Sequence, residues 1–176
     1  MKTARLLAAA VAAGGLALSG AIASGDGGMS DAEIAHIAYT AGAIDAAAGK
    51  QALAKSRNAK VRAFAQTMVR DHEAVNGQAL ALAKKLNVTP APNGTSAALS
   101  KAAQATMSRL ATLDGAAFDQ AYVRNEVEFH RTVNHALETQ WIPSADNAEL
   151  KALLETGLAL FREHQGHAEH LAQEVR

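Results

Sequence analysis

Residues 58–86 read NAKVRAFAQTMVRDHEAVNGQALALAKKL, and their periodicity decides the fold. Apolar side chains recur there at intervals of three and four residues, which is the spacing of one face of an α-helix. Asn58 is a suitable N-cap residue, and two prolines and a glycine within residues 87–94 end the helix. This segment is therefore predicted to be a long amphipathic helix. Its apolar stripe comprises Val61, Phe64, Ala65, Met68, Val75, Ala79, Leu82 and Leu86.

The same spacing predicts three more long helices. The capping box Ser30-Asp31-Ala32-Glu33 opens the first of them, which runs to about Lys55. Another lies between Gly115 and Pro143, and the last covers about residues 150–175. No stretch of the sequence has the alternating apolar pattern that is typical of a β-strand. The chain is therefore expected to be all-α.

The four long helices are predicted to match in length, at about 25–30 residues or roughly 40 Å each. Short connections join the first to the second and the third to the fourth, so each pair is expected to form an antiparallel hairpin. The connection between the second and third is long, and a shorter helix is predicted within it over about residues 97–113. This plan is typical of a ferritin-like four-helix bundle with a long crossover. An up-down bundle with an extra helix and an irregular helical domain are the alternatives.

The N-terminus has the features of an export signal. Lys2 and Arg5 precede an apolar run over residues 6–18, and Ala21-Ile22-Ala23 matches a small-x-small cleavage pattern. The apolar run is shorter than the stretch of about 20 residues that crosses a bilayer. We therefore expect residues 1–23 to be a cleaved signal peptide and residues 24–176 to be a periplasmic or secreted domain without a stable membrane span. An uncleaved N-terminal anchor is the alternative.

The composition argues against several classes of partner and cofactor. The 176 residues include 17 basic and 17 acidic side chains and only 4% aromatic residues, which opposes nucleic-acid binding. The absence of cysteine excludes thiolate metal sites and covalent haem, and no haem is expected. The sequence contains no P-loop, Rossmann fingerprint or Gly-x-Ser-x-Gly motif, so neither a nucleotide cofactor nor a serine hydrolase is expected. The oligomeric state is left open, a homo-oligomer included.

Polar side chains on the apolar stripes carry the functional signal. At about 100° per residue, His72 and His164 project near the middle of their stripes, and Asp45 lies within the stripe of the first helix. Glu126 and His130 lie one turn apart towards one edge of the third stripe, where exposure to solvent is the alternative. Within each predicted hairpin these residues lie at similar distances from the turn. Each of the four long helices is thus expected to direct a carboxylate or an imidazole inward at nearly the same height.

These five residues predict a single metal ion within the bundle, because an isolated buried carboxylate has to pair, protonate or bind a cation. Imidazole and carboxylate ligands suit zinc, iron or copper. The alternative is a metal-free polar network in a structural or stress-response protein, with His72 donating to Asp45 and His164 bonding to Tyr122 or Glu126. A single-metal oxidoreductase is the third hypothesis. No residue is assigned a catalytic role, and a binding protein is favoured over an enzyme.

The other histidines give weaker signals. His167 and His170 follow His164 at intervals of three, but this strip turns away from the apolar stripe. A solvated face is therefore favoured there over a surface metal site. His36 and His135 point away from their stripes and are expected at the surface.

Several short runs resemble those of a known family. They are Ala43-Ile44-Asp45 with Gly49, Phe64-Ala65-Gln66 with Met68 and Asp71-His72, Gly115-Ala116-Ala117-Phe118-Asp119 with Tyr122, and then His130 and His164. Over nearly the whole mature chain the sequence resembles the ferritin-like domain-of-unknown-function family 4142, exported bacterial proteins often labelled as predicted outer membrane proteins. The resemblance implies a helical bundle in the cell envelope, with no settled activity. It also implies that the family's recurring polar residues fall on Asp45 (usually glutamate), Asp71, His72, Asp119, Tyr122, His130 and His164.

A pair of irons is not expected in this bundle. A di-iron site needs a glutamate on each of two helices and Glu-x-x-His on each of the other two. The residues three before His72 and His164 are Val69 and Phe161, so the bridging carboxylates are missing. We therefore predict neither ferroxidase activity nor iron storage.

Overall fold

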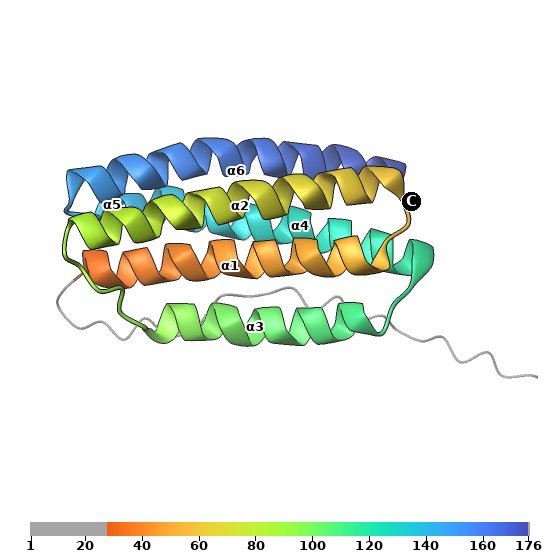
Figure 1. The fold of residues 1–176 in the computed structure, drawn as a ribbon, viewed down its shortest axis with the longest axis horizontal. Coiled ribbons are helices and arrows are strands. Elements are labelled where there is room, and N and C mark those ends of the chain that lie inside the picture. The colour runs from red at the N-terminus through yellow and green to blue at the C-terminus, as the bar shows by residue number, and fades with distance from the viewer. Residues whose placement is uncertain (1–27, 176) are drawn as a thin grey trace, which may run out of the picture.

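The computed structural model describes residues 28–175, and every regular element within that range is a helix (Figure 1). The all-α prediction is thus confirmed, whereas the predicted signal peptide lies outside the described residues. None of the helices in residues 28–175 combines the length and apolar character needed to cross a membrane. The elements are α1 (Asp31–Lys55), α2 (Ala59–Lys85), α3 (Gly94–Ala111), α4 (Gly115–Ala136), a π-helical turn (Leu137–Trp141), α5 (Ile142–Ser144) and α6 (Ala148–Glu174).

The helix ends follow from local side-chain capping. The Ser30 hydroxyl accepts a hydrogen bond from the Glu33 backbone N–H at 3.3 Å, and the Glu33 carboxylate accepts one from the Ser30 N–H at 3.0 Å. The Asn58 side chain caps α2 in the predicted way. The crossover helix begins at Gly94, three residues earlier than predicted, because Asn93 caps it by accepting a hydrogen bond from the backbone N–H of Ser96.

Four of the long helices run side by side, and α3 lies along the outer side of α1 (Figure 1). α1 packs against α2, α4 packs against α6, and contacts of α2 with α6 and of α1 with α4 join the two pairs. The crossover helix is held to α1 by polar contacts as well as apolar ones. Gln51 Nε2 donates to the carbonyl oxygen of Met107 at 3.0 Å, and Lys55 Nζ donates to that of Ala111 at 2.8 Å.

The interior consists of two apolar clusters with a polar layer between them. In each of the four core helices a buried polar residue separates the part that enters one cluster from the part that enters the other. On α1, for example, Ala41 belongs to the first cluster, Asp45 to the polar layer and Ala48 to the second cluster. The larger side chains of the first cluster include Ile34, Ile37, Leu137, Trp141, Leu154 and Phe161, and those of the second include Val61, Phe64, Met68, Phe118, Tyr122 and Leu171.

Close approach of α1 and α2 depends on a glycine beside the polar layer. A Cβ atom at Gly49 would lie 3.0 Å from the carbonyl oxygen of Ala65 and 2.9 Å from Cγ2 of Val69. The first of these contacts is with backbone, so it cannot be relieved by a side-chain rotation alone. Gly49 therefore sets the spacing of the hairpin that presents Asp45 and His72 to each other.

We predict that Gly49→Ala destabilises the protein by about 1–3 kcal/mol, because overpacking outweighs the better helix propensity of alanine. Gly77→Ala on α2 is the matched control, since a Cβ there meets nothing within 4 Å. The free energy of unfolding of Gly77→Ala is expected to rise by up to about 1 kcal/mol. Urea denaturation measures both free energies of unfolding, and a Gly49→Ala variant as stable as its Gly77→Ala counterpart would contradict the packing argument.

Candidate metal centre

All five predicted ligand residues lie in the polar layer. Asp45 comes from α1, His72 from α2, Glu126 and His130 from α4, and His164 from α6. Their exposed fractions are between 0% and 3%. Glu126 and His130, for which exposure at the stripe edge was the alternative, are 1% exposed because α4 packs against both α1 and α6. The fold thus brings acid and imidazole groups from four helices into one buried place.

The three imidazole rings form a compact triangle. Their centroids are 5.3 Å apart for His72 and His164, 5.5 Å for His130 and His164, and 5.6 Å for His72 and His130. One nitrogen from each ring lies within 4.8 Å of the others. Metal–nitrogen bonds are about 2.0–2.1 Å long, so small side-chain rotations would let one ion contact all three rings.

Two carboxylates border this triangle. Oδ2 of Asp45 is 3.4 Å from Nε2 of His130 and 3.6 Å from Nε2 of His72. Oε2 of Glu126 is 3.9 Å from Nδ1 of His130. Asp45, Glu126 and His130 therefore form a second group whose ligand atoms lie within 4.8 Å of one another. His130 belongs to both groups.

A backbone hydrogen bond determines which nitrogen of His130 is free. Nδ1 of His130 lies 3.0 Å from the carbonyl oxygen of Glu126, one turn earlier on α4. Since a carbonyl can only accept, Nδ1 is the protonated nitrogen and Nε2 carries the lone pair. A single free nitrogen can serve only one ion, so the two groups that share His130 describe one site and not two.

The metal-free network expected as the alternative is not formed as predicted. The 3.6 Å separation of His72 and Asp45 is too long for a hydrogen bond. His164 bonds neither Tyr122 nor Glu126, because its Nε2 lies 3.0 Å from Oδ2 of Asp71. Several buried polar atoms of the layer have no hydrogen-bond partner among the residues that the structure describes. They are both carboxylate oxygens of Asp45, both ring nitrogens of His72, Oε2 of Glu126, Nε2 of His130 and Nδ1 of His164. The hydroxyl of Tyr122, in the second apolar cluster, is also without a partner among these residues.

Burial shifts the protonation of the layer in a direction that suits metal binding. Desolvation lowers the pKa of His72 to about 4, and it also lowers the pKa of His164. Burial, reinforced by the nearby Asp45 carboxylate, raises the pKa of Glu126 well above its usual range. At neutral pH His72 and His164 are therefore neutral imidazoles with lone pairs, and a cation bound beside Glu126 would compete with a proton for its carboxylate.

Residues 16–171 match the model of a family described as a domain of unknown function (DUF4142). The chain belongs to the DUF4142 family. The family predicted from the short runs is thereby confirmed. No curated protein and no solved structure matches this chain.

Three further polar residues of this DUF4142 domain are buried or partly buried. Asp71 contacts His164, Tyr122 is fully buried, and Asp119 is 7% exposed. The family resemblance pointed to all three, whereas the helical stripes did not mark them as ligands. Helical periodicity does not identify Asp71, because it lies one residue from His72 and away from the middle of the apolar face of α2. It contacts His164 only because α2 packs against α6.

The remaining histidines do not join the site. His135, His167 and His170 are exposed, as predicted. His36 was expected at the surface but is only half-exposed, because its neighbours Ile34 and Ile37 on α1 are buried in the first apolar cluster. The His167 and His170 strip thus offers no buried ligand set.

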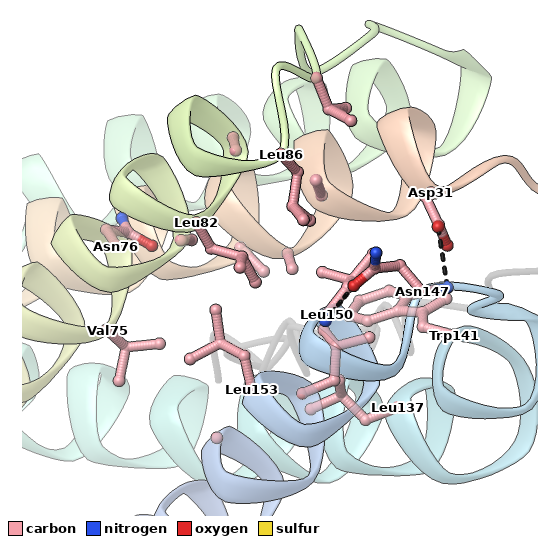
Figure 2. A pocket seen from close by; sticks show the side chains of 18 of the residues that line it. Asp31, Val75, Asn76, Leu82, Leu86, Leu137, Trp141, Asn147, Leu150 and Leu153 are labelled. Carbon is pink, nitrogen blue, oxygen red and sulfur yellow. Dashed lines mark hydrogen bonds between the residues drawn. The ribbon is translucent and has the colours of Figure 1, made fainter.

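An apolar pocket of about 70 Å³ lies beside the centre, between α1, α2, α6 and the π-helical turn (Figure 2). Its wall includes Val75, Leu82, Leu137 and Leu153, and Asp31 at its edge accepts a hydrogen bond from the Asn147 backbone N–H (Figure 2). Phe161 also lines this pocket, and its ring stacks on His72 with centroids 4.6 Å apart. Phe161 therefore separates the pocket from the imidazole triangle.

We predict that the metal-free protein loses stability as the pH falls from about 6.5 to about 4. The pKa of His72 is about 4 in the folded protein against 6.5 in the unfolded chain, so the unfolded chain takes up the proton first. The free energy of unfolding is therefore highest above pH 6.5 and falls as the pH approaches 4. The loss that is due to His72 amounts to about 3 kcal/mol. The lowered pKa of His164 likewise reduces the free energy of unfolding as the pH falls. The raised pKa of Glu126 has the opposite effect, because at pH values above the ordinary pKa of glutamate the folded protein takes up this proton before the unfolded chain does.

Urea denaturation of the metal-free protein at a series of pH values measures this effect. A His72→Gln variant isolates it, because glutamine does not titrate and the other groups are unchanged. The variant should show a shallower loss of stability between pH 6.5 and pH 4. Equal slopes for the two proteins would mean that His72 is not held neutral by burial.

Proposed function

We propose that this protein binds one metal ion inside the bundle, through His72, His130, His164 and Asp45, with Glu126 as an additional carboxylate. The observation that carries the proposal is the set of buried, unpartnered ligand atoms from four helices within one layer. Each such atom would cost free energy if it were left without a partner. A cation bound among them would satisfy several at once.

The donor atoms indicate which ions suit the site. Three imidazole nitrogens and one or two carboxylate oxygens, with no sulfur, favour zinc, ferrous iron or copper. Neutral imidazoles contribute no charge, and Asp45 and Glu126 together contribute two negative charges when both are ionised. That charge balances a divalent ion and reduces the cost of burying it.

A single ion is favoured over a pair. The positions that would supply bridging carboxylates in a di-iron bundle hold Val69 and Phe161, and the ring of Phe161 is stacked on His72. His130 has only one nitrogen free for a metal, since its Nδ1 is bonded to the Glu126 carbonyl. We therefore propose neither iron storage nor ferroxidase activity.

The proposed setting is the cell envelope. The basic and apolar N-terminal residues support export through a cleaved signal peptide at residues 1–23, into the periplasm or the medium. We further propose the ferritin-like form of four-helix bundle, on the support of two hairpins joined by a crossover that contains α3. The burial of all five ligand residues, with Phe161 between them and the pocket, favours a protein that holds an ion over one that turns over a bulky substrate.

Metal analysis of protein purified without an affinity tag tests this function. We predict one equivalent of zinc, iron or copper per chain after incubation with micromolar metal and gel filtration. His130→Gln should weaken binding by more than about tenfold, because it removes the residue common to both ligand groups. His135→Gln is the matched control on the same helix, since His135 is exposed, and it should bind like wild type.

Bound metal should also raise the free energy of unfolding, by about 2.7 kcal/mol at a free concentration 100 times the Kd. At the same free metal concentration this gain in the free energy of unfolding should fall to about 1.4 kcal/mol or less in His130→Gln and be retained in His135→Gln. Wild-type protein that refuses zinc, iron and copper at micromolar concentrations would instead support a structural protein with a metal-free polar layer.

A further inference from the structure

The carboxylate of Asp71 links the surface of the bundle to its polar layer. Asp71 is on α2, and its Oδ2 is 3.0 Å from Nε2 of His164 on α6. On its other side, Arg70 donates from Nε to Oδ1 at 2.6 Å and from Nη2 to Oδ2 at 3.0 Å. The Asp71 side chain is 16% exposed and that of Arg70 is 71% exposed, so the chain Arg70–Asp71–His164 runs from solvent to the buried centre.

These contacts define the state of the His164 ring. A carboxylate paired with a guanidinium is ionised and can only accept hydrogen bonds. Nε2 of His164 must therefore carry the hydrogen in the neutral ring, and Nδ1 carries the lone pair. Nδ1 of His164 is buried and has no hydrogen-bond partner among the described residues. Nδ1 is therefore the nitrogen of this ring that is free to bind a metal ion.

We propose that Asp71 is a positioning residue that selects Nδ1 of His164 as the metal-binding atom. The proposal deepens the metal-binding function above and rests on it for the role of the ligand. It predicts a mixed coordination set, in which His164 binds through Nδ1 and His130 binds through Nε2. Different hydrogen-bond partners determine which nitrogen is free in each ring. For His164 the partner is the side-chain carboxylate of Asp71, and for His130 it is the backbone carbonyl of Glu126.

A carboxylate behind a metal-bound imidazole has two effects. It fixes the tautomer and orientation of the ring, and it makes the ligand nitrogen more basic. Loss of such a group typically weakens metal binding by about 10–100-fold. A competing interpretation is that Asp71 only ties α2 to α6, in which case its removal would lower stability without changing how His164 binds.

Nuclear magnetic resonance of the imidazole nitrogens distinguishes these interpretations. In metal-free wild-type protein, long-range proton–nitrogen correlations should show His164 with its proton on Nε2. Asp71→Asn should weaken this preference, because the amide lacks the negative charge and can turn its NH2 group towards Nε2. This part of the experiment does not depend on metal binding.

Zinc titration supplies the second readout. On zinc binding, the wild-type spectrum should show Nδ1 of His164 and Nε2 of His130 as the metal-bound nitrogens. Zinc affinity should fall about 10–100-fold in Asp71→Asn. Glu73→Gln is the matched control, because Glu73 is an exposed carboxylate on α2 that pairs with Lys50, and its affinity should match wild type.

A second variant guards against a general loss of folding. Arg70→Gln removes the exposed partner but leaves the Asp71 carboxylate in place, so it should keep the Nε2–H form of His164 and most of the zinc affinity. If Asp71→Asn bound zinc as tightly as wild type, or if zinc sat on Nε2 of His164, the proposal would be overturned. If wild-type His164 had its proton on Nε2 but the protein bound neither zinc, iron nor copper, the metal-binding function and the ligand role of His164 would be overturned. Asp71 would still be the group that fixes the tautomer of His164.

Discussion

Burial of the Asp45 carboxylate is the constraint on which the rest of the centre depends. A carboxylate taken out of water costs several kcal/mol unless a cation or hydrogen-bond donors compensate it. Asp45 is 0% exposed, and neither of its oxygens has a hydrogen-bond partner among residues 28–175. Nε2 of His130 and Nε2 of His72 lie 3.4 Å and 3.6 Å from Oδ2 of Asp45, and the Glu126 carboxyl group is also close to it. The proposed ion, held between the carboxylate and the imidazoles, would compensate this cost.

The surrounding fold serves to hold that layer together. Two apolar clusters close it from both ends, and Gly49 lets α1 and α2 approach closely enough for their polar residues to meet. Phe161 covers His72 and shields the imidazoles from the neighbouring pocket. Around the ring of ligands, the Glu126 carbonyl and the Asp71 carboxylate determine which nitrogens are free. The rings of His130, His164 and His72 are thus each positioned by a contact with a group other than the ligand side chains.

Periodicity was enough to predict most of this arrangement. His72, His164 and Asp45 could be placed inside because each lies in the middle of an apolar stripe, and helical spacing determines which residues share a face. Burial of Glu126 and His130 was less certain from sequence, because residues at a stripe edge are covered only when a second neighbouring helix packs there. The π-helical turn at Leu137–Trp141 and the contact of Asp71 with His164 depend on packing between helices, which a single-chain pattern does not contain.

X-ray absorption at the zinc edge, on tag-free protein loaded with one equivalent of zinc, tests the central claim most directly. The spectrum should show only nitrogen and oxygen ligands at about 2.0–2.2 Å, with outer-shell scattering from about three imidazole rings. A spectrum without imidazole scattering would contradict the claim that one ion completes the buried layer. So would a second zinc a few ångströms from the first.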